Sequence, residues 1–578
     1  MNIMKKLTFG TPEKFVPSMF CENFTYTETP VKYDINNIKY KQTARRVKLE
    51  FPLEPDECIF GLGLLLHSIN HTHHKIAQRV NADPKGYTGD THAPVPFFVT
   101  NKGYGVYVDT ARDTTFNCGY IKPPMESELK ESSEAAGDAP AVTTDELYKT
   151  NKTNVKSYLT VEISAPGVDI YLIEGDSVGD IVAQYNMLSG GGCQVPDWGL
   201  GTLYRCYSKY TQQQVMDTAD YFKEHDLPIS TIGLEPGWQS QSYSCSFVWD
   251  KERYPEPQKM VEHLKSKGYH INLWEHAFTS PSAPFYREML PHAGEYEVWG
   301  GLVPDFATEK AVKIFSDYHR DNIVSMGIDG FKLDECDNSD YTNHWSFPHC
   351  ADFPSGLDGE QYHNLFGTLY VKTMMKALDG TPTMGEVRNL GALAASYPFV
   401  LYSDLYHPLE FLGALTSSGV SGLLWSPEVR HADSKNEFIR RLQMVVFSAQ
   451  CLINAWYCEE LPWKKFDCED EVRELLKVRE SLIPKLKEAF KLYHEKGIPP
   501  VRPLVMDYTG DSETWELNDQ YMFCDDLLVA PVIYWLEERS VYLPVSDKWV
   551  DYWTGEPVES GRFTVRTDKI PVYRRVKE

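Results

Sequence analysis

The 578-residue sequence lacks several features that would assign it to a particular class of protein. It has no apolar run of about 18 residues, so it predicts no membrane-spanning helix. The lysines near its N-terminus are not followed by an apolar stretch, which argues against a secretory signal peptide. It also has no internal repeat and no low-complexity tract. We therefore expect a globular protein of the cytoplasm.

Positive charge is scarce. The chain has 57 lysines and arginines against 82 aspartates and glutamates, which gives a formal net charge of -25. Such an excess of acid argues against nucleic acid or an anionic membrane as the partner, because both would repel it. A neutral ligand such as a sugar is compatible with it, and most of these charges are expected simply to keep the protein in solution.

Cysteines are present but show no disulfide framework. The twelve are scattered, and Cys206, Cys336 and Cys451 lie in or beside apolar segments. This placement is typical of reduced thiols packed in a core, as expected for a cytoplasmic protein.

Eight short apolar segments rich in β-forming residues alternate with stretches of helical periodicity. Strands that are buried on both faces have this composition, and strands alternating with helices predict a parallel sheet. Eight such units predict a (β/α)8 barrel of the TIM type, within the α/β class. The strand segments are residues 199–206, 228–235, 270–277, 330–335, 382–388, 400–406, 422–428 and 451–457, and the clearest helices are 212–225, 258–267, 309–326 and 438–449.

Two β-rich regions flank the predicted barrel. We expect an N-terminal β-sandwich domain over residues 1–190, the barrel over 191–498, and a C-terminal β-sandwich domain over 499–578 that covers one end of the barrel. The acidic stretch 125–145 is predicted to be an exposed loop. The long aperiodic connection 337–359 inside the barrel is expected to be functional.

Polar residues end most of the apolar segments. In a TIM barrel the active site lies at the C-terminal ends of the strands, so these residues are candidates for chemistry. Each one alone is equally well explained as a helix cap or a solvated charge, but accidental convergence of the whole set is far less expected. The set is Glu235, Glu275, His276, Lys332, Asp334, Glu386, Arg388, Asp404, Glu428 and Asn454.

Asp334 is the most informative of these acids. Two carboxylates on different barrel strands, one ionised and one protonated, are the minimum equipment of a glycosidase. Lys332 lies two residues earlier, on the same face of its strand, and is expected to keep Asp334 ionised. A purely structural ion pair at the barrel mouth is the alternative.

Around these acids the sequence resembles glycoside hydrolase family 31, the retaining α-glycosidases. Phe331-Lys332-Leu333-Asp334 matches the family's nucleophile motif in its lysine-containing form, and Arg388 precedes Asp404 by the sixteen residues that separate the family's arginine and acid/base aspartate. Other matches extend through most of the chain and include Gly61-Leu62-Gly63, Pro304-Asp305-Phe306, Arg502-Pro503-Leu504 and Trp553-Thr554-Gly555.

The resemblance implies a mechanism and its residues. Asp334 would attack the anomeric carbon, Asp404 would act as acid and then as base, and Arg388 would orient sugar hydroxyls or Asp404. Retention requires the two carboxyl groups to lie about 5 to 6 Å apart. The implied substrate is an oligosaccharide or glycoside with a terminal non-reducing α-linked sugar, and neither a cofactor nor a metal is expected.

The chain departs from the family where sugar hydroxyls are read. Glu235 replaces a common aspartate, Asn454 replaces a histidine, and Glu428 begins a segment unlike the family's Asp-Ile-Gly-Gly-Phe. These changes look most like the α-galactosidase branch, because Glu235 and Trp238 would suit an axial O4. An α-glucosidase or α-xylosidase is the alternative. The predicted substrate-binding residues are Glu235, Trp238, Trp274, Glu275, His276, Lys332, Arg388, Trp425, Glu428 and Asn454, although buried tryptophans are commonly just core.

Two other functions compete with this interpretation. A metal-dependent barrel hydrolase is suggested by a histidine cluster and by His276 at a strand end, but the cluster lies in the N-terminal region, away from the barrel. A non-catalytic sugar-binding homologue is the second rival, and the presence of both aspartates and Arg388 weighs against it. A homo-oligomer is compatible with the sequence. The clustered histidines are His67, His71, His73 and His74.

Overall fold

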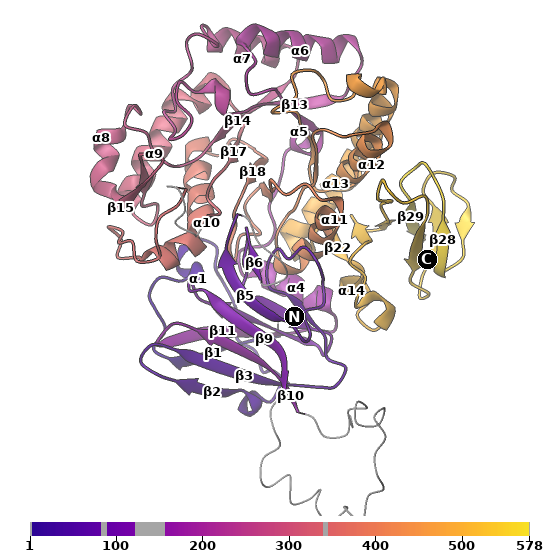
Figure 1. Cartoon of the computed structure of the whole chain (residues 1–578). Coiled ribbons are helices and arrows are strands. Elements are labelled where there is room, and N and C mark those ends of the chain that lie inside the picture. The colour runs from indigo at the N-terminus through magenta and orange to yellow at the C-terminus, as the bar shows by residue number, and fades with distance from the viewer. Residues whose placement is uncertain (1–2, 83–88, 122–155, 339–344, 577–578) are drawn as a thin grey trace, which may run out of the picture.

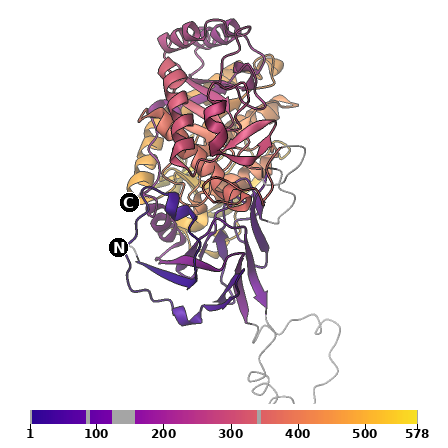
Figure 2. The same ribbon diagram turned by 90° about the vertical axis from the view of Figure 1, so that its left-hand side faces the viewer.

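The computed structural model describes residues 3–82, 89–121, 156–338 and 345–576, so the predicted acidic loop at 125–145 lies outside the described residues. The chain forms three parts in sequence order (Figure 1). A β-rich N-terminal domain lies below the barrel, and a smaller β-rich C-terminal domain, coloured yellow, lies beside it. The view turned by 90° also has the N-terminal domain below the barrel (Figure 2).

The predicted (β/α)8 barrel is confirmed. All neighbouring pairs in its sheet are parallel. A parallel bridge between Leu401 and Trp425 closes the ring between the sixth and seventh strand segments. The strands are β12 (Thr202–Arg205), β13 (Ile229–Leu234), β14 (His270–Glu275), β17 (Gly330–Leu333), β18 (Gly385–Val387), β19 (Phe399–Leu401), β20 (Glu428–Val429) and β21 (Cys451–Asn454).

The seventh strand segment is broken. Trp425 pairs with β19, but β20 begins only at Glu428 and pairs with β21. Pro427 lies between the two pieces and has no backbone N–H to donate to a ladder, which accounts for the interruption. The predicted segment 422–428 therefore contributes to the ring in two short contacts rather than as one strand.

Four of the barrel helices begin at side chains that cap them. Thr211 forms a capping box with Gln214, and Thr308, Asp358 and Ser434 each accept a hydrogen bond from the first turn of the following helix. Apolar residues at helical spacing then turn one face of each helix toward the strands. These helices are α6 (Gln212–Glu224), α7 (Pro257–Ser266), α9 (Glu309–Asn322), α10 (Gly359–Leu378), α11 (Pro408–Ser417), α12 (Lys435–Val446) and α13 (Glu469–Lys496).

A hairpin between β14 and α9 was not predicted. It consists of β15 (Ala293–Val298) and β16 (Gly301–Pro304), which pair antiparallel. Most of β15 is exposed or half-buried and its sequence contains two glutamates, so it lacks the apolar alternation by which strands are recognised.

The N-terminal domain contains two sheets that share one apolar core. Facing side chains such as Phe51 of one sheet and Phe98 of the other contact edge to face, with ring centroids 5.6 Å apart. One sheet has the order β1 (Ile3–Gly10), β11 (Gly167–Glu174), β8 (Tyr104–Asp109), β7 (Phe97–Thr100) and β4 (Ile59–Gly61). The other has the order β2 (Lys39–Gln42), β3 (Val47–Leu53), β10 (Ser157–Ile163), β9 (Thr114–Ile121), β5 (Lys75–Val80) and β6 (Asp90–Thr91).

The C-terminal domain packs against the side of the barrel, so the prediction that it covers one end is wrong. Arg440 and Gln443 of α12 donate hydrogen bonds to backbone carbonyls at 567–569, and Lys485 of α13 pairs with Asp526. Its larger sheet contains β22 (Val501–Pro503), β23 (Tyr521–Phe523), β24 (Leu527–Val529), β29 (Val572–Val576), β26 (Lys548–Asp551) and β27 (Pro557–Val558). A second sheet pairs β25 (Arg539–Leu543) with β28 (Gly561–Val565).

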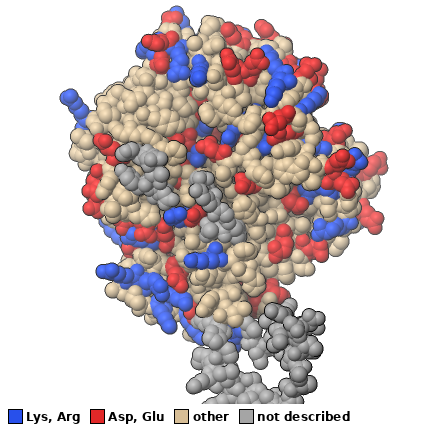
Figure 3. Space-filling model, in the orientation of Figure 1, with Lys and Arg blue, Asp and Glu red and all other residues tan. Residues whose placement is uncertain are grey.

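Each of the twelve cysteines is a free thiol, and Cys206, Cys336 and Cys451 are buried as predicted. Acidic and basic side chains are mixed across the face of the molecule in Figure 3. None of the helices in the described residues combines the length and the apolar character needed to cross a bilayer.

The N-terminal domain is fixed to the barrel by close backbone contact. Ser417 of α11 donates a hydrogen bond to the carbonyl of Leu65 at 2.6 Å, and Gly63 N–H donates to Ser421 Oγ at 2.8 Å. Gly413 lies in the same helix, where a Cβ would stand only 1.9 Å from the carbonyl oxygen of Leu66. The absence of a side chain at Gly413 therefore lets the two domains approach this closely.

We predict that Gly413→Ala destabilises the protein, because the added methyl group forces this interface apart. Overpacking of this kind costs about 1–3 kcal/mol, which outweighs the gain of roughly 1 kcal/mol from replacing glycine inside a helix. Thermal unfolding checks this. Gly510→Ala is the matched control, because a Cβ there meets no atom within 4 Å. Equal melting temperatures for the two variants would contradict the prediction.

Candidate active site

Three adjacent strands bring Asp334, Arg388 and Asp404 together. Asp334 directly follows β17, Arg388 directly follows β18, and Asp404 comes shortly after β19. Arg388 Nη1 donates to Asp334 Oδ1 at 3.2 Å and to Asp404 Oδ2 at 2.7 Å. One nitrogen atom therefore joins the two carboxylates that the sequence singled out.

A third carboxylate holds the other edge of this guanidinium. Asp337 Oδ2 accepts hydrogen bonds from Arg388 Nε at 3.0 Å and is 2.9 Å from Nη2. Burial acts to raise the pKa of Asp337, but Arg388 and the hydrogen bond from His92 hold it below its ordinary value. Asp337 is thus a buried, ionised carboxylate that fixes the position of Arg388.

The surroundings of Asp334 and Asp404 differ. Asp334 Oδ2 accepts a hydrogen bond from Trp274 Nε1 at 2.6 Å and Oδ1 accepts one from the Glu335 backbone N–H at 2.9 Å. Its side chain is only 10% exposed, whereas that of Asp404 is 69% exposed. The positive charge of Arg388 lowers the pKa of Asp404 well below its ordinary value. Asp334 is therefore rigidly held, and Asp404 is ionised at a solvent-facing position.

The prediction that Lys332 is the cation beside Asp334 is wrong. The cation that hydrogen-bonds Asp334 is Arg388. Lys332 Nζ instead lies 3.2 Å from both carboxylate oxygens of Glu235. Two residues along a strand are roughly 6–7 Å, so Lys332 lies one layer deeper in the barrel than Asp334. It pairs with the acid that ends β13, the strand beyond β14, rather than with the acid two residues later.

A second ionic layer lies beneath the three strand ends. The buried Arg205 donates to Glu235 Oε1 at 3.2 Å, to Asn272 Oδ1 at 2.8 Å and to Glu386 Oε2 at 2.7 Å. Together with Lys332, Arg205 supplies two cations for the two carboxylates of Glu235 and Glu386. Arg205 was not predicted, although an arginine within an apolar strand segment is a signal that could have identified it.

Glu275 and His276 were predicted to bind substrate, but neither reaches the site. Glu275 is fully buried on the outer face of β14, where it accepts a hydrogen bond from Tyr370 at 2.8 Å and lies 3.2 Å from His319. Successive side chains of a strand point to opposite faces, so Trp274 faces the site and Glu275 faces the helices. His276 is also fully buried, and this burial lowers its pKa to about 3. It is a neutral ring packed near Trp274.

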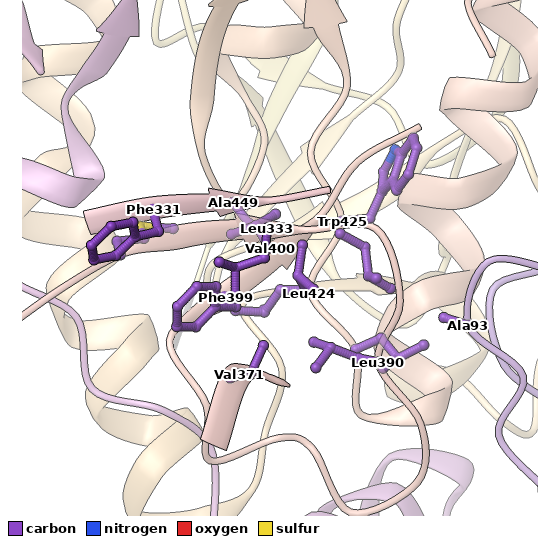
Figure 4. Packing of buried hydrophobic residues seen from close by; sticks show 14 of the residues in the cluster. Ala93, Phe331, Leu333, Val371, Leu390, Phe399, Val400, Leu424, Trp425 and Ala449 are labelled. Atoms are coloured by element: carbon purple, nitrogen blue, oxygen red, sulfur yellow. The ribbon is translucent and has the colours of Figure 1, made fainter. Parts of the chain in front are cut away.

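The predicted tryptophans have different positions. Trp274 lies at the site because its indole N–H binds Asp334. Trp238 has no exposed surface and donates its N–H to the carbonyl of Trp274 at 2.6 Å, so it is a core residue rather than a sugar platform. Trp425 is likewise buried within the apolar cluster shown in Figure 4, which also includes Ala93 of the N-terminal domain.

Glu428 and Asn454 reach the site only through an arginine. Glu428 accepts a hydrogen bond from Asn454 Nδ2 at 2.8 Å and pairs closely with Arg430 Nε. Arg430 Nη2 in turn lies 3.9 Å from Asp404 Oδ1. The residues predicted to read sugar hydroxyls here form a buried pair with each other, and Arg430 is the member that borders Asp404.

Glu335 is a residue of the site that the sequence analysis did not single out. Burial and then the neighbouring charge of Asp334 raise its pKa to about 8. Its backbone is left-handed, with φ of 58°, which turns its side chain toward Tyr243, whose hydroxyl lies 3.3 Å from Oε1. Its position directly after Asp334 was a signal that the strand-end criterion overlooked.

Exposed aromatic side chains extend outward from Asp404. Arg430 stacks on Tyr406, whose ring lies 5.2 Å from that of His431. The half-exposed Tyr457 and Trp456 continue the series, with ring centroids 5.4 and 4.7 Å from the preceding ring. This aromatic rim lies on the solvent side of Asp404.

The histidines near residue 70 belong to the N-terminal domain, as expected, and not to the strand ends of the barrel. His71 is fully buried and bonds the carbonyl of Gly61, while its neighbours His73 and His74 lie at the surface of the N-terminal domain. In the part of the chain that the structure describes, no group of three or more histidine, cysteine, aspartate or glutamate side chains is arranged to hold a metal ion.

Comparison with known proteins identifies relatives across most of the chain. An α-xylosidase of Emericella nidulans is 23% identical over 83% of this chain and 61% of its own length. Alpha-glucosidase 2 of Bacillus thermoamyloliquefaciens is 27% identical over 74% of this chain and 58% of its own. An α-xylosidase of Saccharolobus solfataricus is 22% identical over 92% of this chain and 71% of its own. The chain thus spans about three-fifths of the length of the first two. None of these three relatives is named as an α-galactosidase, so they do not support the predicted α-galactosidase branch.

Solved structures share the fold. A dextranase of Flavobacterium johnsoniae, complexed with glucose, superimposes with a TM-score of 0.78 at 21% identity, over 94% of this chain and 68% of its own. A cycloalternan-degrading enzyme from Trueperella pyogenes gives 0.75 at 21% identity, over 92% of this chain and 78% of its own.

Family models cover all three parts of the chain. The N-terminal galactose mutarotase-like domain of glycosyl hydrolase 31 matches residues 20–117, and the family's C-terminal domain matches 497–577. The model of the glycosyl hydrolases family 31 TIM-barrel domain matches residues 193–489, which is more than half of the sequence. The chain therefore belongs to glycosyl hydrolase family 31.

Proposed function

We propose that the protein is a retaining α-glycosidase in which Asp334 is the nucleophile and Asp404 the acid/base. The observation that carries this proposal is the shared nitrogen of Arg388, which lies 3.2 Å from an oxygen of Asp334 and 2.7 Å from one of Asp404. The nearer oxygens are therefore no further apart than these two distances combined. This closeness favours the roughly 5–5.5 Å separation of carboxyl groups in retaining enzymes over the roughly 6.5–9.5 Å of inverting ones.

The two carboxylates suit different steps. Asp334 is held by Trp274, Arg388 and a backbone N–H, so its attacking oxygen is fixed before the sugar arrives. Bond formation at the anomeric carbon would give a covalent glycosyl-aspartate. The exposed Asp404 would protonate the departing oxygen, then take a proton from the water that releases the sugar.

Arg388 adjusts Asp404 between these steps. While bound to Arg388 the carboxylate is ionised, because the arginine lowers its pKa, and this is the form that acts as a base. To act as an acid, Asp404 must carry a proton, and moving away from Arg388 toward the leaving group would raise its pKa. Its exposed side chain has room for that movement.

For the sugar we propose a terminal α-glucoside or α-xyloside in preference to an α-galactoside. The curated relatives are named α-xylosidase and α-glucosidase. Glu235 and Trp238 were expected to suit the axial O4 of galactose, but Trp238 is buried and both oxygens of Glu235 face Lys332. The leaving group would lie along the aromatic rim outside Asp404, which ends at Trp456.

We further propose that the domains extend over residues 1–190, 191–498 and 499–578 and that both flanking domains are β-sandwiches. Two sheets with one shared core in the N-terminal domain, and two sheets with their own apolar cluster in the C-terminal domain, support this.

Replacement of Asp334 by alanine should abolish turnover of nitrophenyl α-glycosides, because it removes the carboxylate that forms the glycosyl-enzyme bond. Asp433→Ala is the matched control, since Asp433 is an exposed aspartate outside the Arg388 network, and its activity should match the wild type. Proton NMR of the wild-type reaction should show the α-anomer as the first product. A β-anomer, or an active Asp334→Ala variant, would refute the nucleophile assignment.

Replacement of Asp404 by alanine should produce a loss that depends on the leaving group. General acid catalysis contributes about 10²–10⁴-fold, and a leaving group as stable as a nitrophenolate needs little of it. We expect a loss in that range for first-step rates with alkyl or sugar leaving groups and a much smaller loss with nitrophenyl glycosides. Single-turnover measurements on both substrate types test this, and an equal loss on both would exclude Asp404 as the acid.

A panel of nitrophenyl α-glucoside, α-xyloside and α-galactoside should separate the candidate sugars. We expect kcat/KM for the glucoside or the xyloside to exceed that for the galactoside. The hydroxyl orientation at C4 and the presence of C6 distinguish the three substrates, and a site built for one hydroxyl pattern discriminates against another. Faster turnover of the galactoside would restore the α-galactosidase assignment.

A further inference from the structure

The N-terminal domain inserts a histidine between an acid and a serine of the barrel. His92 follows β6 and is 1% exposed. Its ring Nδ1 lies 2.6 Å from Asp337 Oδ2 and its Nε2 lies 2.7 Å from Ser403 Oγ. We propose that His92 is a positioning residue that sets Arg388 and Asp404 for catalysis, an inference that rests on the proposed function.

The hydrogen bonds of His92 form a consistent series. A neutral imidazole has one N–H and one bare nitrogen. With the proton on Nδ1, the ring donates to the carboxylate of Asp337, and its Nε2 accepts the hydroxyl proton of Ser403. Both ring nitrogens are then satisfied in a place from which water is excluded.

On one side the series ends at Arg388. Asp337 uses a single oxygen, Oδ2, for His92 and for both Arg388 nitrogens, whereas its other oxygen is buried with no partner among the described residues. Without His92, only Arg388 would hold the carboxylate of Asp337, through this single oxygen. The guanidinium would then lose its fixed orientation, and with it the placement of Nη1 between the two catalytic carboxylates.

On the other side the series ends at the backbone of the two residues that flank Asp404. Ser403 Oγ also accepts a hydrogen bond from the Leu405 N–H at 3.1 Å, and the Ser403 carbonyl accepts one from Arg430 at 3.1 Å. The residues on both sides of Asp404 are therefore held by the hydroxyl that His92 binds. One side chain from another domain thus constrains both the arginine and the acid/base.

The role predicts a loss in kcat rather than in KM. His92 is too deeply buried to contact a sugar, so substrate affinity should change little. Misplacement of catalytic groups by about 1 Å lowers rates by up to roughly 10²-fold. We expect His92→Ala to lower kcat about 10- to 100-fold with KM within about 3-fold of the wild type.

The conservative variant His92→Asn tests the contact with Asp337. Asparagine can place an N–H near the Nδ1 position and so keep the bond to Asp337, which should rescue part of kcat. His71→Ala is the matched control: His71 is equally buried in the same domain but bonds the carbonyl of Gly61. It should lower the melting temperature without a selective loss of kcat.

A double-mutant cycle with Asp337→Ala tests whether His92 acts through Asp337. If it does, the loss in the double variant should be well short of the product of the two single losses. Independent losses, an effect confined to KM, or a kcat loss no larger than that of His71→Ala would overturn the proposal.

A crystal structure of His92→Ala gives a second readout that does not need activity. Arg388 and residues 403–405 should be displaced relative to the wild-type protein, and unchanged positions would refute the positioning role. If the wild type hydrolyses none of the α-glycosides, the proposed function fails, while this structure still decides the role of His92.

Discussion

The site depends on one buried guanidinium shared by three carboxylates. Arg388 bonds Asp334, Asp337 and Asp404, which come from two strand ends on either side of its own. A buried cation is tolerable only when it is paired and fully hydrogen-bonded, and here every contact is also a constraint on a functional acid. Closure of the parallel barrel makes this possible, because it brings consecutive strand ends to one rim.

Depth along the strands divides the charges into two groups. Arg205 and Lys332 neutralise Glu235 and Glu386 inside the barrel, whereas Arg388 serves the acids at the rim. Each layer satisfies its own charges, so the lower layer can support the upper one without competing for its cation. This arrangement leaves Asp404 with Arg388 as its main partner, which keeps it ionised and yet able to move.

Much of this could be predicted from the sequence because barrel periodicity and strand ends are local signals. The eight segments and the meeting of Asp334, Arg388 and Asp404 follow from them. Which face a residue takes does not follow from a strand end alone, so Glu275 was placed in the site although it points to the helices. The predicted partner of Lys332 was wrong for a related reason, since the depth of Lys332 in the barrel depends on the register between strands. His92 gave no signal, because it is 245 residues from Asp337 in the chain.

The contribution of His92 makes the N-terminal domain part of the catalytic unit. Among the described residues, its loop supplies the only hydrogen bond to the Asp337 side chain that does not come from Arg388 itself. Without that domain, Asp337 and the turn around Asp404 would face solvent, and the arginine would be pulled toward a hydrated carboxylate. The Gly413 contact with Leu66 therefore bears on chemistry as well as stability, since Leu64 of the same segment is hydrogen-bonded to Thr91 and Ala93 on either side of His92.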